Sequence, residues 1–551
     1  MKALAIVVAL VAACGSSDRG PHFRAAGATT PHRGGTLHWS MVQQVRTLDP
    51  AIAYDEITAY FTHALFDTLV GYEGSDPARP GSGLKLVPHL AESWTISDDH
   101  LVYTFTLRPG ITFSDGQPVV AGDFVYGLER VLATAESPFP AFLDDVAGAK
   151  DVVDHKAAHC AGLRAIDDRH LEIRLSRPYA GFLYILAMSF ATPQKQAWVQ
   201  AAGDQLRRKV LGTGPWIVES WDEGQRLELA RNPHYWDPTR PLLDRQIVLE
   251  NIPGDTAYLM FEAGDLDVVD RLPAPVYTWI QTRDDWRPFV HASSAMNVYG
   301  ERLNVRKKPV DDVRVRRAMN YALNKEHVVR LLSGGATPSH GLLPPGLFGR
   351  DETLAPYPYD PAKAKALLAE AGYPDGFDIE YVTIKDDTSE KLAASMQADL
   401  AVVGVRVKIT LMSFATYLSA VGREDGPSFS YSAWFADFPD PSNFIDTRFH
   451  SRQIAKENSN NDSFYANPAL DQLIDAARLE GDADKRAAMY HQIERVLYDD
   501  APWIWNFHRK FIEVTQPYVQ GYQPHPVWVR AYEDAWLDLG PDGARLPKEA
   551  P

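Results

Sequence analysis

One stretch of the chain limits its fold class more than any other. Residues 377–384 (FDIEYVTI) and 405–413 (VRVKITLMS) alternate apolar and polar side chains, which is typical of half-buried strands. Between them, residues 389–404 (SEKLAASMQADLAVVG) have the composition of a helix. A strand, a helix and a second strand in this order predict a parallel pair joined by a helical crossover. Strand and helix patterns mix along the rest of the chain, so we expect an α/β protein.

The chain is too long for a single hydrophobic core. Its 551 residues correspond to roughly three or four compact units. Apolar residues make up 45% of the sequence and aromatic residues 11%, which is enough for large buried cores and argues against a mainly disordered chain. The net charge of −17 argues against a nucleic-acid partner, because phosphate binding requires a basic face.

The first residues have the features of a cleavable secretion signal. Lys2 precedes an apolar run over residues 3–13, which is too short to span a bilayer. The run ends Val-Ala-Ala-Cys, which resembles a bacterial lipobox in which the Cys14 sulfur takes a diacylglyceryl group. We therefore expect a signal peptide over residues 1–13 and a lipidated flexible tether over residues 14–34. An ordinary secretory signal with an incidental Cys14 is the alternative.

The sequence contains no recognisable catalytic or metal-binding motif. The His-Glu-x-x-His, Gly-x-Ser-x-Gly, Walker and Rossmann patterns are all missing. His155 and His159 have the spacing of helical metal ligands, but their charged, turn-like surroundings favour a solvated surface. Cys160 has no Cys-x-x-Cys partner, so we expect a buried or loop thiol; with Cys14 lipidated, no intrachain disulfide can form. We expect no metal, no cofactor and no catalytic residue.

A single carboxylate stands in an apolar setting. Asp437 follows the strand-like run of residues 432–436 (SAWFA) and precedes Phe438, and no basic residue is nearer in sequence than Arg448. A carboxylate removed from water is costly unless it gains a cation and hydrogen bonds. The residues alone leave open whether Asp437 caps a turn, pairs with a distant Arg of the same chain, or receives a cation from a ligand.

Asp440 is the rival acid in the same stretch. It opens the sequence Asp-Pro-Ser-Asn, which is typical of a turn that leads into a helix. We therefore expect Asp440 to cap the following helix and not to serve a ligand.

Five segments carry a family resemblance. They are residues 90–132 (LAESWTISDDHLVYTFTLRPGITFSDGQPVVAGDFVYGLERVL), 212–237 (GTGPWIVESWDEGQRLELARNPHYWD), 315–329 (VRRAMNYALNKEHVV), 364–377 (AKALLAEAGYPDGF) and 434–444 (WFADFPDPSNF). In their order and content they resemble the solute-binding lipoproteins of ABC importers, in the oligopeptide- and dipeptide-binding family. The likeness extends from about Gly35 to Asp538.

The resemblance implies a two-lobed periplasmic-binding-protein fold of type II with an additional small domain inserted in the first lobe. The first lobe is then discontinuous, over residues 35–72, 210–292 and 509–540. The inserted domain covers residues 73–209 and the second lobe residues 293–508. In such proteins a ligand held between the lobes closes the hinge.

The resemblance also implies where a ligand would bind. In the peptide-binding relatives an Asp in this Trp-x-Ala-Asp context receives the ligand's α-ammonium group; here that residue is Asp437, with Trp434 walling the pocket. The ligand's main chain would pair with the segment from Ala53 to Glu56, which includes Tyr54 and Asp55, and with the segment from Ser432 to Ala436.

Three further residues are weaker candidates. Phe139 and Phe414 stand where relatives carry aromatic lining residues, although each is also compatible with an ordinary core position. Arg423 could meet a ligand carboxylate, but its Gly-Arg-Glu-Asp-Gly loop favours exposure to solvent.

Together with the lipobox, the resemblance implies a non-catalytic, monomeric oligopeptide receptor that is lipid-anchored outside the cytoplasm and delivers peptides to an ABC permease. One alternative keeps the fold but binds another solute, such as a nickel complex, haem or an oligosaccharide. Another alternative is a signalling-peptide sensor or chaperone that uses the same cleft. An extracytoplasmic hydrolase would need a nucleophile and base that the sequence does not offer.

Overall fold

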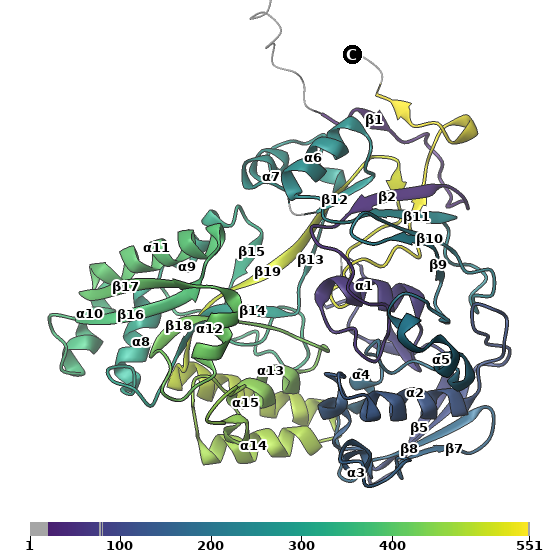
Figure 1. Ribbon diagram of the computed structural model, residues 1–551. Coiled ribbons are helices and arrows are strands. Elements are labelled where there is room, and N and C mark those ends of the chain that lie inside the picture. The colour runs from purple at the N-terminus through teal and green to yellow at the C-terminus, as the bar shows by residue number, and fades with distance from the viewer. Residues whose placement is uncertain (1–19, 77–78, 80, 271, 549–551) are drawn as a thin grey trace, which may run out of the picture.

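The structure is a computed structural model that describes residues 20–76, 79, 81–270 and 272–548. The predicted signal peptide, Cys14 and the start of the predicted tether lie outside these residues. Helices and strands are mixed along the chain, and the predicted α/β fold with two lobes is confirmed (Figure 1). None of the helices in the described ranges is long and apolar enough to cross a membrane.

The first lobe is built on a four-stranded sheet in the order β2-β11-β10-β9, in which only β2 and β11 are parallel. Leu37 and Trp39 point inward from β2, and the Trp39 ring stacks on Phe61 of helix α1 at 5.9 Å. The elements of this lobe are β2 (Thr36–Ser40), α1 (Glu56–Leu65), β9 (Trp216–Asp222), β10 (Arg226–Arg231), β11 (Arg245–Leu249), α6 (Gly254–Ala263), β12 (Val268–Asp270), α7 (Ala274–Gln281), η3 (Arg287–Phe289), β13 (Val290–Ser294), β20 (Val519–Gln520), β21 (Trp536–Leu537) and η5 (Pro541–Gly543).

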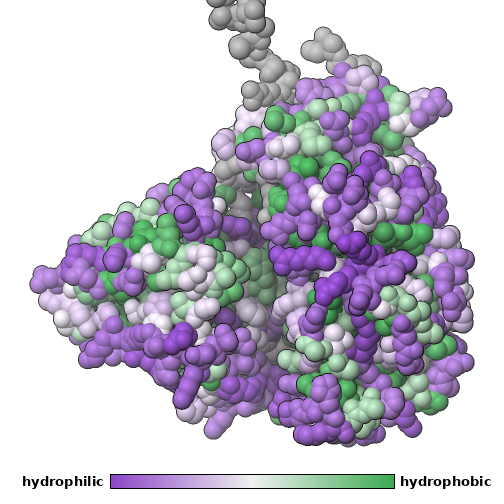
Figure 2. Space-filling model, viewed as in Figure 1, coloured by the Kyte–Doolittle hydropathy of each residue, from purple (hydrophilic) through white to green (hydrophobic). Residues whose placement is uncertain are grey.

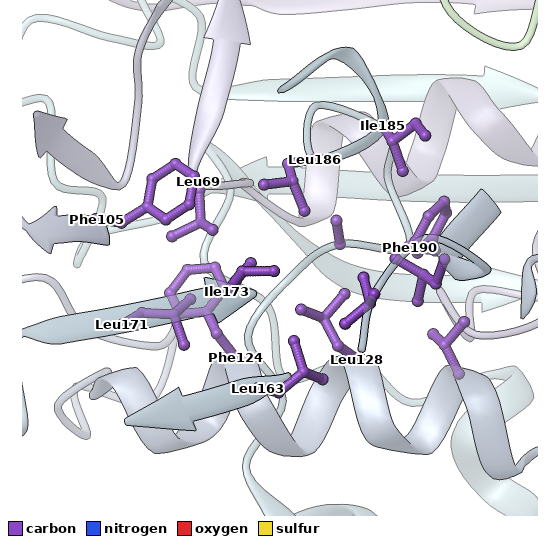
Figure 3. Packing of buried hydrophobic residues seen from close by; sticks show 14 of the residues in the cluster. Leu69, Phe105, Phe124, Leu128, Leu163, Leu171, Ile173, Ile185, Leu186 and Phe190 are labelled. Carbon is purple, nitrogen blue, oxygen red and sulfur yellow. The ribbon is translucent and has the colours of Figure 1, made fainter. Parts of the chain in front are cut away.

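The inserted region has its own antiparallel sheet, in the order β5-β6-β8-β7, packed on helix α2. Leu171 and Ile173 of β8 are fully buried, as their alternation in sequence predicts, and Figure 3 shows them beside Phe124 of α2. Its elements are β4 (Leu86–Pro88), β5 (Ala91–Ile96), β6 (Val102–Leu107), α2 (Ala121–Ala133), η1 (Pro140–Leu143), α3 (Ala149–Val153), β7 (Leu163–Ala165), β8 (His170–Arg174), α4 (Phe182–Ile185), α5 (Gln196–Ala202) and η2 (Gly203–Arg207). Strand β4 pairs with β3 (Val70–Tyr72), which ends the first segment of the first lobe.

The second lobe contains the predicted strand–helix–strand unit. Strand β16 runs parallel to β17 from the pair Phe377–Val405 to the pair Ile384–Met412, and α11 forms the crossover. The elements of this lobe are β14 (Asn297–Leu303), α8 (Val313–Ala322), α9 (Lys325–Leu331), β15 (Ala336–Pro338), α10 (Pro361–Glu370), β16 (Phe377–Ile384), α11 (Asp387–Val402), β17 (Val405–Met412), α12 (Phe414–Val421), β18 (Phe429–Phe435), α13 (Pro441–Phe449), η4 (Ser451–Gln453), α14 (Pro468–Leu479) and α15 (Ala483–Asp500).

Two stretches of backbone join the lobes. Strand β19 (Trp503–Thr515) pairs with β14 in the second lobe and then with β13 and β12 in the first lobe. In Figure 1 it is the long strand that runs between them. The other stretch is the short link from β13 to β14. The two connections meet where the Ala295 N–H donates a hydrogen bond to the Arg509 carbonyl at 3.2 Å, and we expect the hinge at this point.

The inserted region also contacts the second lobe directly. Phe438, which is 4% exposed, packs in the hydrophobic core of the inserted region, where its ring meets Phe142 edge-on at 6.2 Å. Asp145 pairs with Arg478 of α14. The inserted region therefore braces the segment that carries Asp437.

Part of the segment predicted as a flexible tether, residues 14–34, packs against the rest of the protein. Strand β1 (Phe23–Arg24) pairs with β22 (Leu546–Pro547), and the Asp538 carboxylate accepts hydrogen bonds from the backbone of Gly27 and Ala28. Any flexible tether must end before Gly20, because Gly20 and Pro21 are already buried and the Lys548 N–H donates to the His22 carbonyl at 2.8 Å. The sequence of residues 14–34 could not predict this packing, because the residues that they contact lie more than 500 positions away.

Candidate functional site

Asp437 lies in the short link between strand β18 and helix α13. The strand is held against β14 as far as Ala436, whose N–H donates to the Met296 carbonyl at 2.8 Å. Asp440 then caps α13 by accepting from the Ser442 N–H at 3.0 Å, so that prediction is confirmed. Asp440 also forms a buried pair with Arg486, at 2.7 and 2.8 Å. Its charge is therefore compensated inside the protein, which leaves Asp437 as the candidate for a ligand.

Both oxygens of Asp437 accept hydrogen bonds from neutral donors. The Tyr54 hydroxyl of the first lobe donates to Oδ1 at 2.6 Å, and the Asn443 amide donates to Oδ2 at 3.0 Å. None of the Lys, Arg and His side chains within the described ranges forms an ion pair with Asp437. A carboxylate has about four lone-pair positions. The two neutral donors therefore leave capacity for a third donor that carries charge.

Burial raises the pKa of the Asp437 carboxyl above its ordinary value, although the hydrogen bonds from Tyr54 and Asn443 act in the opposite direction. Burial, and next the charge of Asp437, raise the pKa of the Tyr54 phenol. Tyr54 consequently remains a neutral donor at any physiological pH. Asp437 is therefore a half-buried carboxylate, and no cation among the described residues compensates its charge.

Asn443 organises the second-lobe side of this site. Its Oδ1 accepts from the Asp437 N–H and from the indole N–H of Trp434, each at 3.0 Å. Trp434 and Asp437 therefore both donate to the side-chain amide of Asn443. The Trp434 ring lies 5.4 Å from the Arg448 guanidinium. The sequence gives no signal for this role of Asn443, because an Asn in the first turn of a helix is ordinary.

The free edge of β18 offers backbone groups to a ligand. Strand β16 pairs with β18 only at Phe429 and Ser430. Ala436 directs its N–H toward β14, whereas the Tyr431 carbonyl accepts from Tyr417 at the other edge. Since alternate residues of a strand face opposite edges, Ala433 and Phe435 direct their backbone groups toward that open edge. Within the predicted segment, Ser432 and Ala436 instead bond toward β14.

The first-lobe segment from Ala53 to Glu56 contributes side chains to the site. Tyr54 is 48% exposed, and its ring meets Phe139 edge-on at 5.5 Å. Asp55 caps α1 by accepting from the Thr58 N–H at 2.9 Å, so its carboxylate is already used. Glu56 accepts a hydrogen bond from the Tyr60 hydroxyl at 2.8 Å and lines the cleft between the lobes.

The weaker candidates lie in different environments. Phe139 is 2% exposed and stacks on Phe190 at 4.7 Å, so it is a core residue whose edge reaches Tyr54. Phe414 is 61% exposed at the start of α12. Arg423 is exposed and pairs with Asp425 at 3.0 Å and Glu457 at 3.3 Å. Ser432 is buried, and its hydroxyl accepts from Arg448 at 3.2 Å.

A cleft of about 530 Å³ lies between the lobes next to this site. Figure 2 shows the recess between the second lobe and the rest of the molecule. Its walls include Glu56 and Phe435, which stand two residues from Tyr54 and Asp437 respectively. The lining also includes Asn297 and Arg509, which lie beside the connections between the lobes.

The part of the chain that the structure describes has no group of three or more His, Cys, Asp or Glu side chains arranged to hold a metal ion. Cys160 is buried, its thiol lies 3.3 Å from the Ala147 carbonyl, and burial raises the pKa of that thiol. A buried thiol of raised pKa is a poor nucleophile.

Comparison with known proteins identifies the family. The model of the bacterial extracellular solute-binding proteins, family 5, matches residues 85–456, which is more than half of the chain. The chain belongs to this family. Curated relatives include the dipeptide-binding protein of Escherichia coli, 30% identical over 82% of this chain and 86% of the relative, and di/tripeptide-binding protein 2 of Pseudomonas aeruginosa, 28% identical over 86% and 90%.

Solved structures of similar proteins have the same architecture. The periplasmic binding protein DppA from Helicobacter pylori, in complex with the peptide STSA, matches with a TM-score of 0.74 and 26% identity over 92% of this chain and 99% of that chain. Clavulanic acid biosynthesis oligopeptide binding protein 2 matches with a TM-score of 0.83 and 26% identity over 94% and 99%. The family 5 solute-binding fold therefore extends over nearly the whole chain.

Proposed function

We propose that this family 5 protein is a non-catalytic extracytoplasmic receptor that encloses a peptide between its lobes and delivers it to an ABC permease. The observation that carries the proposal is Asp437, a half-buried carboxylate with two neutral donors and no ion pair to any Lys, Arg or His that the structure describes. The α-ammonium group of a peptide supplies both the missing charge and a third hydrogen-bond donor. A charge-assisted contact of this kind contributes on the order of 1.5–3 kcal/mol.

The open edge of β18 supports a peptide over other amines. A peptide can pair its own N–H and C=O groups with the backbone of Ala433 and Phe435, whatever its side chains are. Relatives named for dipeptides, di/tripeptides and a bound peptide agree with this ligand class. A nickel complex, haem or an oligosaccharide lacks the ammonium that Asp437 requires.

The cellular setting is part of the same proposal. Acylation of Cys14 would anchor a monomeric receptor to the outer side of the membrane, beside its permease, and the residues between Cys14 and Gly20 would serve as the tether. A receptor that senses or chaperones peptides would use the same cleft. Loss of peptide uptake in a strain that lacks the protein would distinguish import from those roles.

Titration calorimetry with a defined tripeptide and its N-acetylated form tests the ligand assignment. Acetylation removes the ammonium but leaves the rest of the peptide unchanged, so we expect affinity to fall about tenfold or more. Equal affinities for the two forms would remove Asp437 from its proposed role. Mass spectrometry of molecules that co-purify with the native protein gives an independent reading of the ligand class.

A further inference from the structure

The N-terminal segment of the described chain is fastened to one end of the first lobe. Gly20 and Pro21 are buried. The Phe23 ring meets the Tyr518 ring edge-on at 5.9 Å. The same ring lies so close to Gly264, directly after α6, that a Cβ at Gly264 would be 2.6 Å from it. From Gly20 onward the chain therefore has a fixed position beside α6.

The C-terminal residues close over this segment. Residues 20–28 and 538–548, which pair through β1 and β22, are called here the terminal clasp. Arg545 pairs with Asp267 at 2.8 Å, and the same carboxylate accepts from the Tyr518 hydroxyl at 2.6 Å. Because Asp267 is fully buried, the terminal clasp is fastened to the core of the first lobe and not only to its surface.

The chain between the predicted acylation site and the terminal clasp is short. Gly20 is six residues after Cys14. A fully extended chain spans about 3.3–3.6 Å per residue, so Gly20 can lie at most roughly 20 Å from Cys14. A compact protein of this length has a radius of gyration of about 24 Å. Because the tether is shorter than the body that it holds, the far end of the molecule cannot turn toward the bilayer.

The terminal clasp lies at the same end of the molecule as α6 and α7, and strands β7 and β8 of the inserted region lie at the opposite end (Figure 1). Leu259 of α6 is 64% exposed, more than any other large hydrophobic residue in the described ranges. It stands five residues before Gly264, or roughly 8 Å along the helix from the Phe23 ring. The end that the tether can hold at a membrane therefore presents an apolar side chain.

The charges next to Gly20 compensate one another. The Asp285 carboxylate, which lies beside Gly20, pairs with Arg283 at 3.0 Å. The neighbouring Asp284 pairs with Arg287 at 2.8 Å. An anionic bilayer repels a chain whose net charge is −17, but these paired side chains add little to that repulsion.

We infer that the end of the first lobe formed by the terminal clasp, α6 and α7 rests against the lipid bilayer into which acylated Cys14 inserts. The short tether holds this end in place, Leu259 meets the lipid headgroups, and the inserted region faces away from the membrane. The inference rests on the proposed function, from which it takes the acylation of Cys14. It adds a fixed orientation of the receptor beside its permease.

Energy transfer to labelled lipids measures this orientation. The full-length lipidated protein, purified from membranes, is inserted into preformed vesicles of phosphatidylethanolamine and phosphatidylglycerol that contain a rhodamine-labelled lipid. A donor fluorophore is attached at Leu259→Cys or, as the matched control, at Ile166→Cys, which is 48% exposed between β7 and β8. Both variants also carry Cys160→Ser, so that each has one site for the label. Thermal unfolding of each labelled protein checks that the fold is retained.

We expect energy transfer from position 259 to exceed that from position 166 about twofold or more, because the tether limits only the first of these distances to the bilayer. Insertion of about twenty Gly and Ser residues after Ser17 should reduce the difference, because a longer flexible chain lets the molecule turn.

Equal transfer from the two positions, or more transfer from position 166, would overturn the proposed orientation. A difference that survived the longer tether would overturn the role of the tether in setting it. If the unlabelled native protein did not stay on the vesicles, the acylation of Cys14 and this orientation would both fail. The calorimetric test of peptide binding would be unaffected by that result, so failure of the anchor and failure of the peptide assignment are distinguishable.

Discussion

The Tyr54 hydroxyl donates a 2.6 Å hydrogen bond to Asp437 Oδ1, although the two residues are 383 positions apart and belong to different lobes. The bond joins the lobes at the side chain that the proposed function assigns to the ligand. A ligand ammonium would therefore meet a carboxylate that is already oriented by Tyr54 from one lobe and Asn443 from the other.

Removing this hydroxyl should change the titration of Asp437. Tyr54→Phe keeps the ring and its edge contact with Phe139 but deletes the hydrogen bond that lowers the pKa of Asp437. We expect the carboxyl pKa, followed by NMR, to rise further. Tyr359→Phe, at a tyrosine that is 43% exposed, is the matched control. An unchanged Asp437 titration in Tyr54→Phe would show that the hydroxyl does not bind the carboxylate in solution.

Asp437→Asn should affect binding much more than folding. The substitution removes a carboxylate whose charge is uncompensated, so we expect the free energy of unfolding to change by less than about 1 kcal/mol. Peptide affinity should fall about tenfold or more, because the ammonium loses its counter-charge. Calorimetry and urea unfolding measure the two effects. A large loss of stability in the ligand-free protein would instead support a structural role for Asp437 within its own chain.

Peptide affinity should depend on pH in a direction set by the raised pKa of Asp437. The carboxylate form binds an ammonium, so affinity should fall as pH falls through that raised pKa. It should also fall above about pH 8, where the α-amino group of the peptide loses its proton. The raised pKa also means that the folded state binds the Asp437 carboxyl proton more tightly than the unfolded state does. The contribution of Asp437 to stability therefore decreases as pH rises from the ordinary carboxyl pKa through the raised pKa. Calorimetry across pH should show the acidic limb in the native protein and lose it in Asp437→Asn.

Local patterns in the sequence predict the elements of this fold because their causes are local. The alternation over residues 377–384 and 405–413 fixes two strands, and the turn chemistry at Asp440 fixes the start of α13. Local patterns do not predict the hydrogen-bond partners of Asp437. Tyr54 reaches it from the other lobe, and Asn443 reaches it because a helix begins at Pro441. Such contacts depend on how distant segments pack, which no local period encodes.

The anchor at Cys14 rests on sequence alone and has a direct test. Cys14→Ser removes the sulfur that would take the diacylglyceryl group, so the protein should leave the membrane fraction. Cys160→Ser is the matched control, because that thiol is buried and is already occupied by the Ala147 carbonyl. Fractionation of cells followed by detection of the protein measures the distribution. Retention of Cys14→Ser in membranes would contradict the lipobox interpretation.

Phe438 should contribute to stability and to the position of Asp437 at once. Its ring is 4% exposed and packs in the core of the inserted region, so Phe438→Ala should lower the free energy of unfolding by about 3–5 kcal/mol. Phe435→Ala is the stability control, because that ring is 46% exposed and should cost much less. Urea unfolding measures both. Since Phe438 adjoins Asp437, its loss should also weaken peptide binding without removing the penalty for N-acetylation. If Phe438→Ala were no more destabilising than Phe435→Ala, the inserted region would not brace this segment.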